Sequence, residues 1–279
     1  MLTLNAYAKV NIGLHVVERR PDGYHNIATV FAPVELFDVI TIEPAPTITV
    51  HTRPSLGIAE HDNLAYRAAA MLQEVAAIND GAKITIRKHI PPGSGLGGGS
   101  SDAATVLRGL CQLWRITPDD STLFSIAQQI GSDVPYFLNP RFAYAEGRGD
   151  ILTVIPPLRQ CPVLIVVPPI AISTAWAYAQ IDLVASFPRQ EALRSIIGLT
   201  NLSDEMLRTL CTNDFEEVVY PVYPILSEIK AALYAAGAHY ASLTGTGSAL
   251  FAFFDNINAA LIAATRFPTY RTFVTHLLA

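Results

Sequence analysis

The sequence predicts an α+β protein of two domains, residues 1–156 and 157–279. Two observations predict the class: apolar residues alternate with period two in the first segment, and later segments switch between that period and the 3.6-residue period of amphipathic helices. A third observation places the boundary. The text IPPLRQCPVLIVVPP, residues 155–169, is rich in proline and separates a strand-rich first half from a mainly helical second half.

The first segment, residues 2–14, alternates apolar and polar side chains, so we expect a strand with one apolar and one polar face. Lys9 and Asn11 lie on the polar face.

Asp62 or Asn63 is the expected cap of the helix predicted at 62–78. The other elements predicted in the first half are strands at 37–43, 48–52 and 83–89, and helices at 62–78 and from about 100 to 114.

The second half opens with a short buried strand within VLIVV and ends in a strand, a helix and a strand. The last three are predicted at 249–254, 256–265 and 271–276.

The composition excludes several classes of protein. Hydrophobic residues make up 51% of the chain and charged residues 15%, which is typical of a compact fold and not of a disordered chain. The net charge of −5, without Lys and Arg clusters, argues against nucleic acid as a partner. Cys111, Cys161 and Cys211 contain no CxxC pair, so we expect reduced thiols and neither a disulfide framework nor a zinc site.

The sequence also lacks targeting signals. Lys9 and Asn11 interrupt the first apolar segment, which excludes the hydrophobic part of a signal peptide, and no run approaches the length of a membrane span. The seven histidines are scattered and form no HExxH motif, so no metal site is predicted. We therefore expect a soluble cytoplasmic protein without a membrane partner.

The stretch PPGSGLGGGSSDAA, residues 91–104, lies between a predicted strand and a predicted helix. Glycines allow a ligand to approach the backbone, and a helix N-terminus presents unpaired N–H groups, so an anion such as phosphate fits there. A flexible or tightly turning linker is the alternative. No lysine follows the glycines, which excludes a Walker P-loop.

A second alternative is a nucleotide-dependent oxidoreductase. Gly93, Gly95 and Gly98 satisfy GxGxxG after a strand, and the acidic residue that this fingerprint needs has candidates in Asp119 and Asp120. Both follow Thr117-Pro118, however, and have the pattern of a helix start, where the fingerprint requires the end of a strand.

Three segments together resemble the GHMP kinases: the glycine-serine stretch, the early AYAKVNIGL and the late LTGTGSALFAFF, residues 243–254. The resemblance runs from Tyr7 to about Phe254. It implies an N-terminal domain similar to the second domain of ribosomal protein S5 and a ferredoxin-like C-terminal domain, with the active site in a cleft between them.

Three more segments resemble one branch of that family: RPDGYHNI, GSDVPYFL and AEGRGD, at residues 20–27, 131–138 and 145–150. The resemblance implies that ATP phosphorylates the 2-hydroxyl of 4-diphosphocytidyl-2-C-methyl-D-erythritol, in the methylerythritol phosphate pathway to isoprenoid precursors. It implies Mg²⁺ as the phosphate counter-ion and small-molecule partners only, without an obligate protein partner. Homoserine or mevalonate kinase activity and a catalytically inactive binding module are the alternatives, and RPDGYHN distinguishes this branch.

Two residues would carry the chemistry. Asp133 matches the family's catalytic aspartate, the proposed general base, whereas its position before Val134-Pro135 by itself indicates a helix cap. Lys9 would pair with Asp133 and orient it towards the substrate hydroxyl; the alternative for Lys9 is an exposed strand lysine.

The resemblance assigns further residues to ATP. The adenine and nucleoside site would include Asn63 and Lys88, whose alternatives are a helix cap and a solvated charge. The residues expected around the phosphates are Pro92, Gly93, Ser94, Gly95, Leu96, Gly97, Gly98, Gly99, Ser100 and Ser101.

The cytidyl substrate would be read by the segment after the Pro21-Asp22-Gly23 turn. Tyr24 would stack on the base and His25 would hydrogen-bond its polar edge. Tyr178 would close the other side of the base, with Thr174 nearby, and Asn11 is also assigned to the substrate. Without the resemblance, Tyr24 and His25 are ordinary loop residues.

Overall fold

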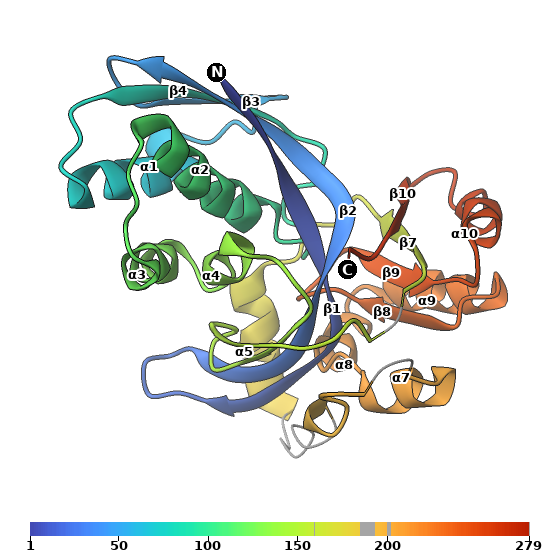
Figure 1. Cartoon of the computed structure of the whole chain (residues 1–279). Coiled ribbons are helices and arrows are strands. Elements are labelled where there is room, and N and C mark those ends of the chain that lie inside the picture. Colours follow the sequence, from blue (N-terminus) through green and yellow to red (C-terminus); the bar gives the residue numbers. More distant parts are fainter. Residues whose placement is uncertain (159, 185–192, 200–201, 279) are drawn as a thin grey trace. The chain divides into compact units, whose positions relative to one another are not determined.

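The computed structural model describes residues 1–158, 160–184, 193–199 and 202–278. The chain forms two compact units, which are called unit 1 and unit 2 below (Figure 1). Unit 1 contains Met1–Ala8, Leu36–Pro92 and Gly97–Pro140, and unit 2 contains Lys9–Glu35, Gly93–Leu96 and Arg141–Ala279. Each unit contains parts of the first two strands of the chain, so the units do not divide at residue 156. The predicted domain boundary at 156/157 stays a prediction.

The two longest strands, β1 (Leu2–Arg19) and β2 (His25–Ala45), pair with each other and contribute residues to both units. The alternation predicted for residues 2–14 is confirmed, since Ala6, Ala8, Val10, Ile12 and Leu14 are buried. The other face is polar, as expected, but its later positions are buried too: Lys9 is 3% exposed and Asn11 1%. The interpretation of Lys9 as an exposed strand lysine is therefore wrong.

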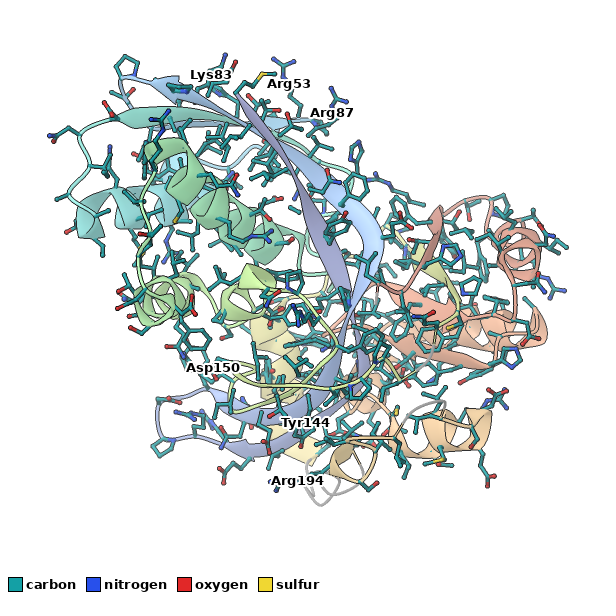
Figure 2. All side chains as sticks on the ribbon, in the orientation of Figure 1. Arg53, Lys83, Arg87, Tyr144, Asp150 and Arg194 are labelled. Carbon is teal, nitrogen blue, oxygen red and sulfur yellow. The ribbon has the colours of Figure 1, made fainter. Side chains whose placement is uncertain are left out.

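Unit 1 places four helices beside a sheet. β4 (Gly81–Arg87) pairs antiparallel with β2 and parallel with β3 (Thr49–Arg53). Ala82, Ile84 and Ile86 of β4 are buried, while the side chains of Lys83 and Arg87 project outward (Figure 2). The helices are α1 (Leu64–Val75), α2 (Gly98–Trp114), α3 (Asp120–Ile130) and α4 (Val134–Leu138), and a 3-10 turn spans Glu60–Asp62.

Side-chain caps start two of these helices. Asn63 accepts a hydrogen bond from the Ala65 N–H and caps α1, as predicted. Asp119 accepts from the Thr122 N–H and caps α3. Because α2 is followed by this capped helix, where the dinucleotide fingerprint needs a strand, the oxidoreductase alternative is wrong.

Unit 2 contains a four-stranded antiparallel sheet in the order β10-β7-β9-β8. Two strand–helix–strand segments build it, one from β7 to β8 and one from β9 to β10, which is the split βαβ arrangement of ferredoxin-like folds. This confirms the predicted ferredoxin-like architecture. The strands are β7 (Pro162–Val167), β8 (Tyr240–Leu243), β9 (Leu250–Phe253) and β10 (Arg271–His276); the helices are α5 (Thr174–Val184), α7 (Asp204–Leu210), α8 (Phe215–Val219), α9 (Pro224–Ala235) and α10 (Ile257–Ala264).

A second sheet region of unit 2 comes from β5 (Ala143–Glu146) and β6 (Ile151–Val154). β5 pairs with β2, Thr29 opposite Ala145, and with β6. Strands β5, β6 and β8 were missing from the sequence prediction, because each has only four residues and too little alternation to stand out from the neighbouring turns.

The three cysteines are thiols, as predicted. Cys111 is half-buried, and Cys161 and Cys211 are buried. Burial raises the pKa of the Cys211 thiol to about 12, which makes this thiol a poor nucleophile. Within the described ranges, no helix has the length and hydropathy needed to cross a bilayer.

We predict that Gly81→Ala destabilises the protein by about 2 kcal/mol or more, because a Cβ at this position would overlap the backbone of Thr47, which cannot move as a side chain does. Chemical denaturation followed by circular dichroism measures the effect. Gly131→Ala is the control, since its φ is 176° and the new Cβ would lie 3.5 Å from Val134 Cγ2, an ordinary contact. Equal unfolding free energies for the two variants would contradict this packing argument.

Candidate functional site

The glycine-serine stretch forms the connection between β4 and α2, as the sequence predicts. Helix α2 begins at Gly98, two residues earlier than expected, and its N-cap Gly97 has a φ of +74°. Gly93 and Gly95 also have positive φ, a conformation that glycine adopts without strain. The positive end of a 17-residue helix therefore follows a loop in which three positions have the backbone conformation that favours glycine.

This loop offers mainly its backbone to a ligand. Pro92, Gly93 and Gly99 are exposed, and Gly95, Gly97, Gly98 and Ser100 are half-buried. The side chains of Ser94, Leu96 and Ser101 are buried, and the Ser101 hydroxyl donates to the Tyr7 carbonyl at 2.7 Å. Of the three serines expected at the phosphates, Ser94 is buried and Ser101 holds α2 against β1, while Ser100 stays accessible.

Lys88 is buried in unit 1 between two carboxylates. Its Nζ donates to Asp38 Oδ2 at 2.5 Å and to Asp102 Oδ2 at 2.6 Å. Asp38 Oδ1 also accepts the N–H groups of His89 and Ile90. Lys88 is 8% exposed, so the interpretation as a solvated charge is wrong.

The protonation of this cluster follows from burial. Burial by itself would lower the pKa of Lys88, but Asp102 and Asp38 outweigh it and the pKa is raised. Burial raises the pKa of the Asp102 carboxyl to about 8, against the opposing attraction of Lys88. Asp102 Oδ1 is buried without a hydrogen-bond partner among the described residues, whereas both oxygens of Asp38 are satisfied. Burial, with the nearby Asp38 carboxyl as a smaller cause, therefore favours the protonated form of Asp102.

Asn11 lies at the centre of a polar cluster in unit 2. Its Oδ1 accepts hydrogen bonds from Lys9 Nζ at 2.6 Å, the Gly245 N–H at 2.9 Å and Thr244 Oγ1 at 3.2 Å. Its Nδ2 donates to Thr29 Oγ1 at 3.0 Å, which fixes the orientation of the amide. Both ends of the Asn11 side chain are thus engaged within the protein.

The three family-like segments meet around this cluster within unit 2. The Lys9 N–H donates to the Leu96 carbonyl at 3.0 Å, and Thr244 Oγ1 lies 3.2 Å from the Gly95 carbonyl oxygen, an alternative acceptor to Asn11 Oδ1 for its one hydrogen. A Cβ at Gly95 would overlap the Thr244 carbonyl oxygen, so this close approach requires glycine. The first segment, the start of the glycine loop and the late LTGTGS segment are therefore one packed arrangement.

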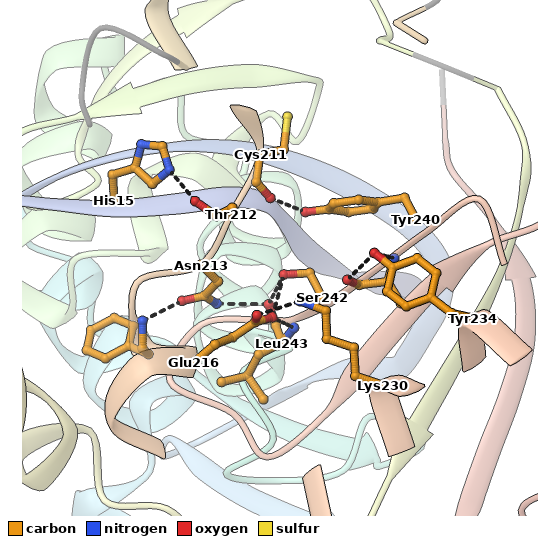
Figure 3. A network of polar contacts seen from close by, with 12 residues as sticks. His15, Cys211, Thr212, Asn213, Glu216, Lys230, Tyr234, Tyr240, Ser242 and Leu243 are labelled. Atoms are coloured by element: carbon orange, nitrogen blue, oxygen red, sulfur yellow. Dashed lines mark hydrogen bonds and ion pairs between the residues drawn. The ribbon is translucent and has the colours of Figure 1, made fainter. Parts of the chain in front are cut away.

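Two residues that the sequence interpretation missed anchor the late segment (Figure 3). Asn213 Nδ2 donates to the carbonyls of Leu243 and Gly245 at 2.8 and 2.9 Å. Glu216 Oε1 accepts the Leu243 N–H at 2.9 Å, and its Oε2 lies 2.5 Å from Lys230 Nζ. No local pattern marks Asn213 or Glu216, because their partners are some 30 residues away along the chain.

The predicted substrate residues lie in unit 2, where His25 and Tyr178 contact each other and Tyr24 and Thr174 have other neighbours. His25 Nε2 lies 2.7 Å from Asp182 Oδ1, and the Tyr178 ring stacks on the His25 ring with centroids 4.7 Å apart. The Tyr24 side chain is exposed, with the Arg148 guanidinium 4.9 Å from the centre of its ring. Thr174 lies apart from these residues, with its Oγ1 3.3 Å from Thr246 Oγ1 of the late segment.

Asp133 occupies the N-cap position of α4, but its side chain makes no capping hydrogen bond. It differs in this respect from Asn63 and Asp119, whose side chains do cap their helices. Capping therefore does not explain an aspartate at position 133. Lys9 belongs to unit 2 and Asp133 to unit 1, and their pairing stays a prediction.

Comparison with family models identifies both domains. Residues 63–140 match the model "GHMP kinases N terminal domain", and residues 190–268 match "GHMP kinases C terminal".

Curated relatives match over nearly the whole chain. A 4-diphosphocytidyl-2-C-methyl-D-erythritol kinase of Chlorobium chlorochromatii (strain CaD3) is 42% identical, over 97% of this chain and 94% of its own. The protein of the same name from Chlorobaculum tepidum (strain ATCC 49652 / DSM 12025 / NBRC 103806 / TLS) is 37% identical, over 95% of this chain and 94% of its own.

Solved structures agree. A crystal structure of a 4-(cytidine 5'-diphospho)-2C-methyl-D-erythritol kinase has a TM-score of 0.83 at 33% identity, with complete coverage of both chains. The Methanococcus jannaschii mevalonate kinase, at 15% identity and a TM-score of 0.74 over 100% of this chain and 98% of its own, shows that the fold extends beyond these relatives. The chain belongs to the GHMP kinases and, within them, to the 4-diphosphocytidyl-2-C-methyl-D-erythritol kinase family.

Proposed function

We propose that this protein transfers the γ-phosphoryl group of ATP to the 2-hydroxyl of 4-diphosphocytidyl-2-C-methyl-D-erythritol, in the methylerythritol phosphate pathway. The observation that carries the proposal is the convergence of the family's first, second and third segments on Asn11 in a chain 42% identical to a protein of that name. The reduced thiols suit a reducing compartment, and we propose that the enzyme acts in the cytoplasm.

In this proposal the substrate hydroxyl oxygen attacks the γ-phosphorus, the bond from that phosphorus to the ADP oxygen breaks, and the hydroxyl proton passes to Asp133. Phosphoryl transfer depends mainly on positioning and on neutralising charge. Lys9 supplies a cation whose position is set by Asn11, and the N–H groups at the start of α2 receive phosphate oxygens.

Mg²⁺ enters the proposal bound to the ATP phosphates. The described residues contain no group of three or more His, Cys, Asp or Glu side chains arranged to hold a metal ion. The phosphate oxygens and water would therefore supply most of its ligands, and we assign it no protein ligand.

The test is a phosphorylation assay with purified protein, ATP and Mg²⁺. The acceptors are the diphosphocytidyl methylerythritol, homoserine and mevalonate, and phosphorus NMR identifies the product. A new phosphomonoester on the cytidyl acceptor alone is the expected result. Phosphorylation of homoserine or mevalonate instead would overturn the substrate assignment.

We predict that Asp133→Asn and Lys9→Met each lower kcat for the cytidyl substrate by about 10²–10⁴-fold, the range by which a positioned acid–base group accelerates a reaction. Release of ADP measures kcat, and circular dichroism verifies the fold. Asp120→Asn, which removes an exposed carboxylate of α3, is the matched control and should stay within about twofold of the wild type. A folded Asp133→Asn enzyme with near-normal kcat would remove the base assignment.

We propose that Lys88 acts on ATP through α2. The Lys88 ammonium donates to two carboxyl groups, one on β2 and one on α2, and so ties the first turns of α2 to the sheet of unit 1. A Cβ at Gly98 would lie 3.4 Å from Lys88 Nζ, which places the ammonium against the first residue of the helix. The cluster thus fixes the helix end that receives the phosphates.

We predict that Asp102→Asn flattens the pH dependence of stability. Asp102 has a pKa of about 8 in the folded chain and about 3.8 when unfolded, so between these values the folded state holds one more proton. Its contribution to the unfolding free energy therefore falls as pH rises, by about 1.4 kcal/mol per pH unit at most. Urea denaturation at pH 5 to 8 should show this decline in the wild type and in Asp80→Asn, an exposed control, but not in Asp102→Asn. Parallel curves for all three proteins would refute the assignment of the proton to Asp102.

A further inference from the structure

The ring of His25 is held on one edge and one face. His25 is the first residue of β2 and is 7% exposed. Its Nε2 lies 2.7 Å from Asp182 Oδ1 on α5, and the Tyr178 ring stacks on it with an angle of 22° between the planes. Phe215 in turn packs edge-on against Tyr178, with centroids 4.9 Å apart. The imidazole therefore has one defined orientation.

The contact with Asp182 decides which ring nitrogen carries the hydrogen. A carboxylate can only accept, so Nε2 is the donor in this pair. The other oxygen of Asp182 lies 3.6 Å from Arg19 Nε, which leaves Oδ1 for the histidine. Among the residues that the structure describes, none provides a hydrogen-bond partner for His25 Nδ1.

A neutral imidazole with hydrogen on Nε2 presents a lone pair at Nδ1. At ring position 4 cytosine has an amino group, a donor, and a uracil-type base has an oxygen, an acceptor. An acceptor at Nδ1 that faces position 4 therefore pairs with cytosine and repels the lone pairs of uracil. If the hydrogen moved to Nδ1, this preference would reverse.

We infer that Asp182 is a positioning residue that sets the tautomer of His25 and so makes the site select a cytosine base over a uracil base. The inference rests on the proposed function, because it concerns the base of the cytidyl substrate. Asp182 acts through His25 and does not itself touch the substrate.

The test compares kcat/KM for the cytidyl substrate and for its uridyl analogue. We expect Asp182→Asn to lower the cytidyl-to-uridyl ratio by about tenfold or more, through KM for the cytidyl substrate, with kcat and KM for ATP within about twofold of the wild type. Asp182→Glu keeps a carboxylate, which can only accept, whereas the amide of Asn can also donate, so Asp182→Glu should restore most of the ratio. Asp204→Asn is the control, because Asp204 Oδ2 forms a comparable hydrogen bond with another histidine, at 2.6 Å from His239 Nδ1.

A second variant separates reading of the base edge from stacking on the base. Tyr24→Ala should raise KM for both substrates equally, since every base offers a face for stacking. Nitrogen-15 NMR of His25 adds a readout that needs no activity: the wild type should show hydrogen on Nε2, and Asp182→Asn should lose this preference.

The outcomes distinguish the two proposals. A wild type that phosphorylates homoserine or mevalonate in place of the cytidyl substrate overturns the proposed function and the selectivity with it. A wild type that phosphorylates the cytidyl substrate, while folded Asp182→Asn keeps the full cytidyl-to-uridyl ratio, overturns this inference alone. Hydrogen on Nδ1 of wild-type His25 also overturns it.

Discussion

The amide oxygen of Asn11 accepts three hydrogen bonds, and the arrangement of the candidate site in unit 2 depends on it. It joins the Lys9 ammonium to Thr244 and Gly245, which come more than 230 residues later in the chain. A buried polar group costs free energy unless it is paired, so an amide that is engaged at both ends in this position restricts the arrangement of its neighbours. The lysine, the late glycine segment and the start of the glycine loop are held together for that reason.

In unit 1 the buried group that needs partners is an ammonium, that of Lys88. Lys88 between Asp38 and Asp102 would be costly as an isolated ion, and its two carboxyl partners remove this cost only with good geometry. Such a cluster tolerates little displacement of α2 relative to β2. A helix N-terminus that receives phosphate needs this rigidity, because its N–H groups act on a ligand only from fixed positions.

Three residues that belong to no sequence motif hold the candidate site in place from behind, through contacts with residues nearer to the ligand. Asn213 and Glu216 bind the backbone of the late segment, and Asp182 binds the side chain of a predicted substrate residue. In the proposed function, the late segment and His25 face the ligands, and Asn213, Glu216 and Asp182 only hold them in position. Their positions in the chain are far from the groups they hold, so local sequence patterns carry no sign of them.

Much of this protein was determined by its sequence alone. Alternation over residues 2–14, the Asn63 cap, the glycines before α2 and the final strand–helix–strand order depend on local periodicity and local hydrogen bonds, and all are present in the structure. The family resemblance also rested on short segments and was confirmed over the whole chain. Tertiary structure decided the rest: that Lys9 and Asn11 are buried on the polar face of β1, that Lys88 pairs with two carboxylates, and that Tyr178 packs on His25. Burial and long-range pairing depend on which segments pack together, and a side chain's own neighbours along the chain do not specify that.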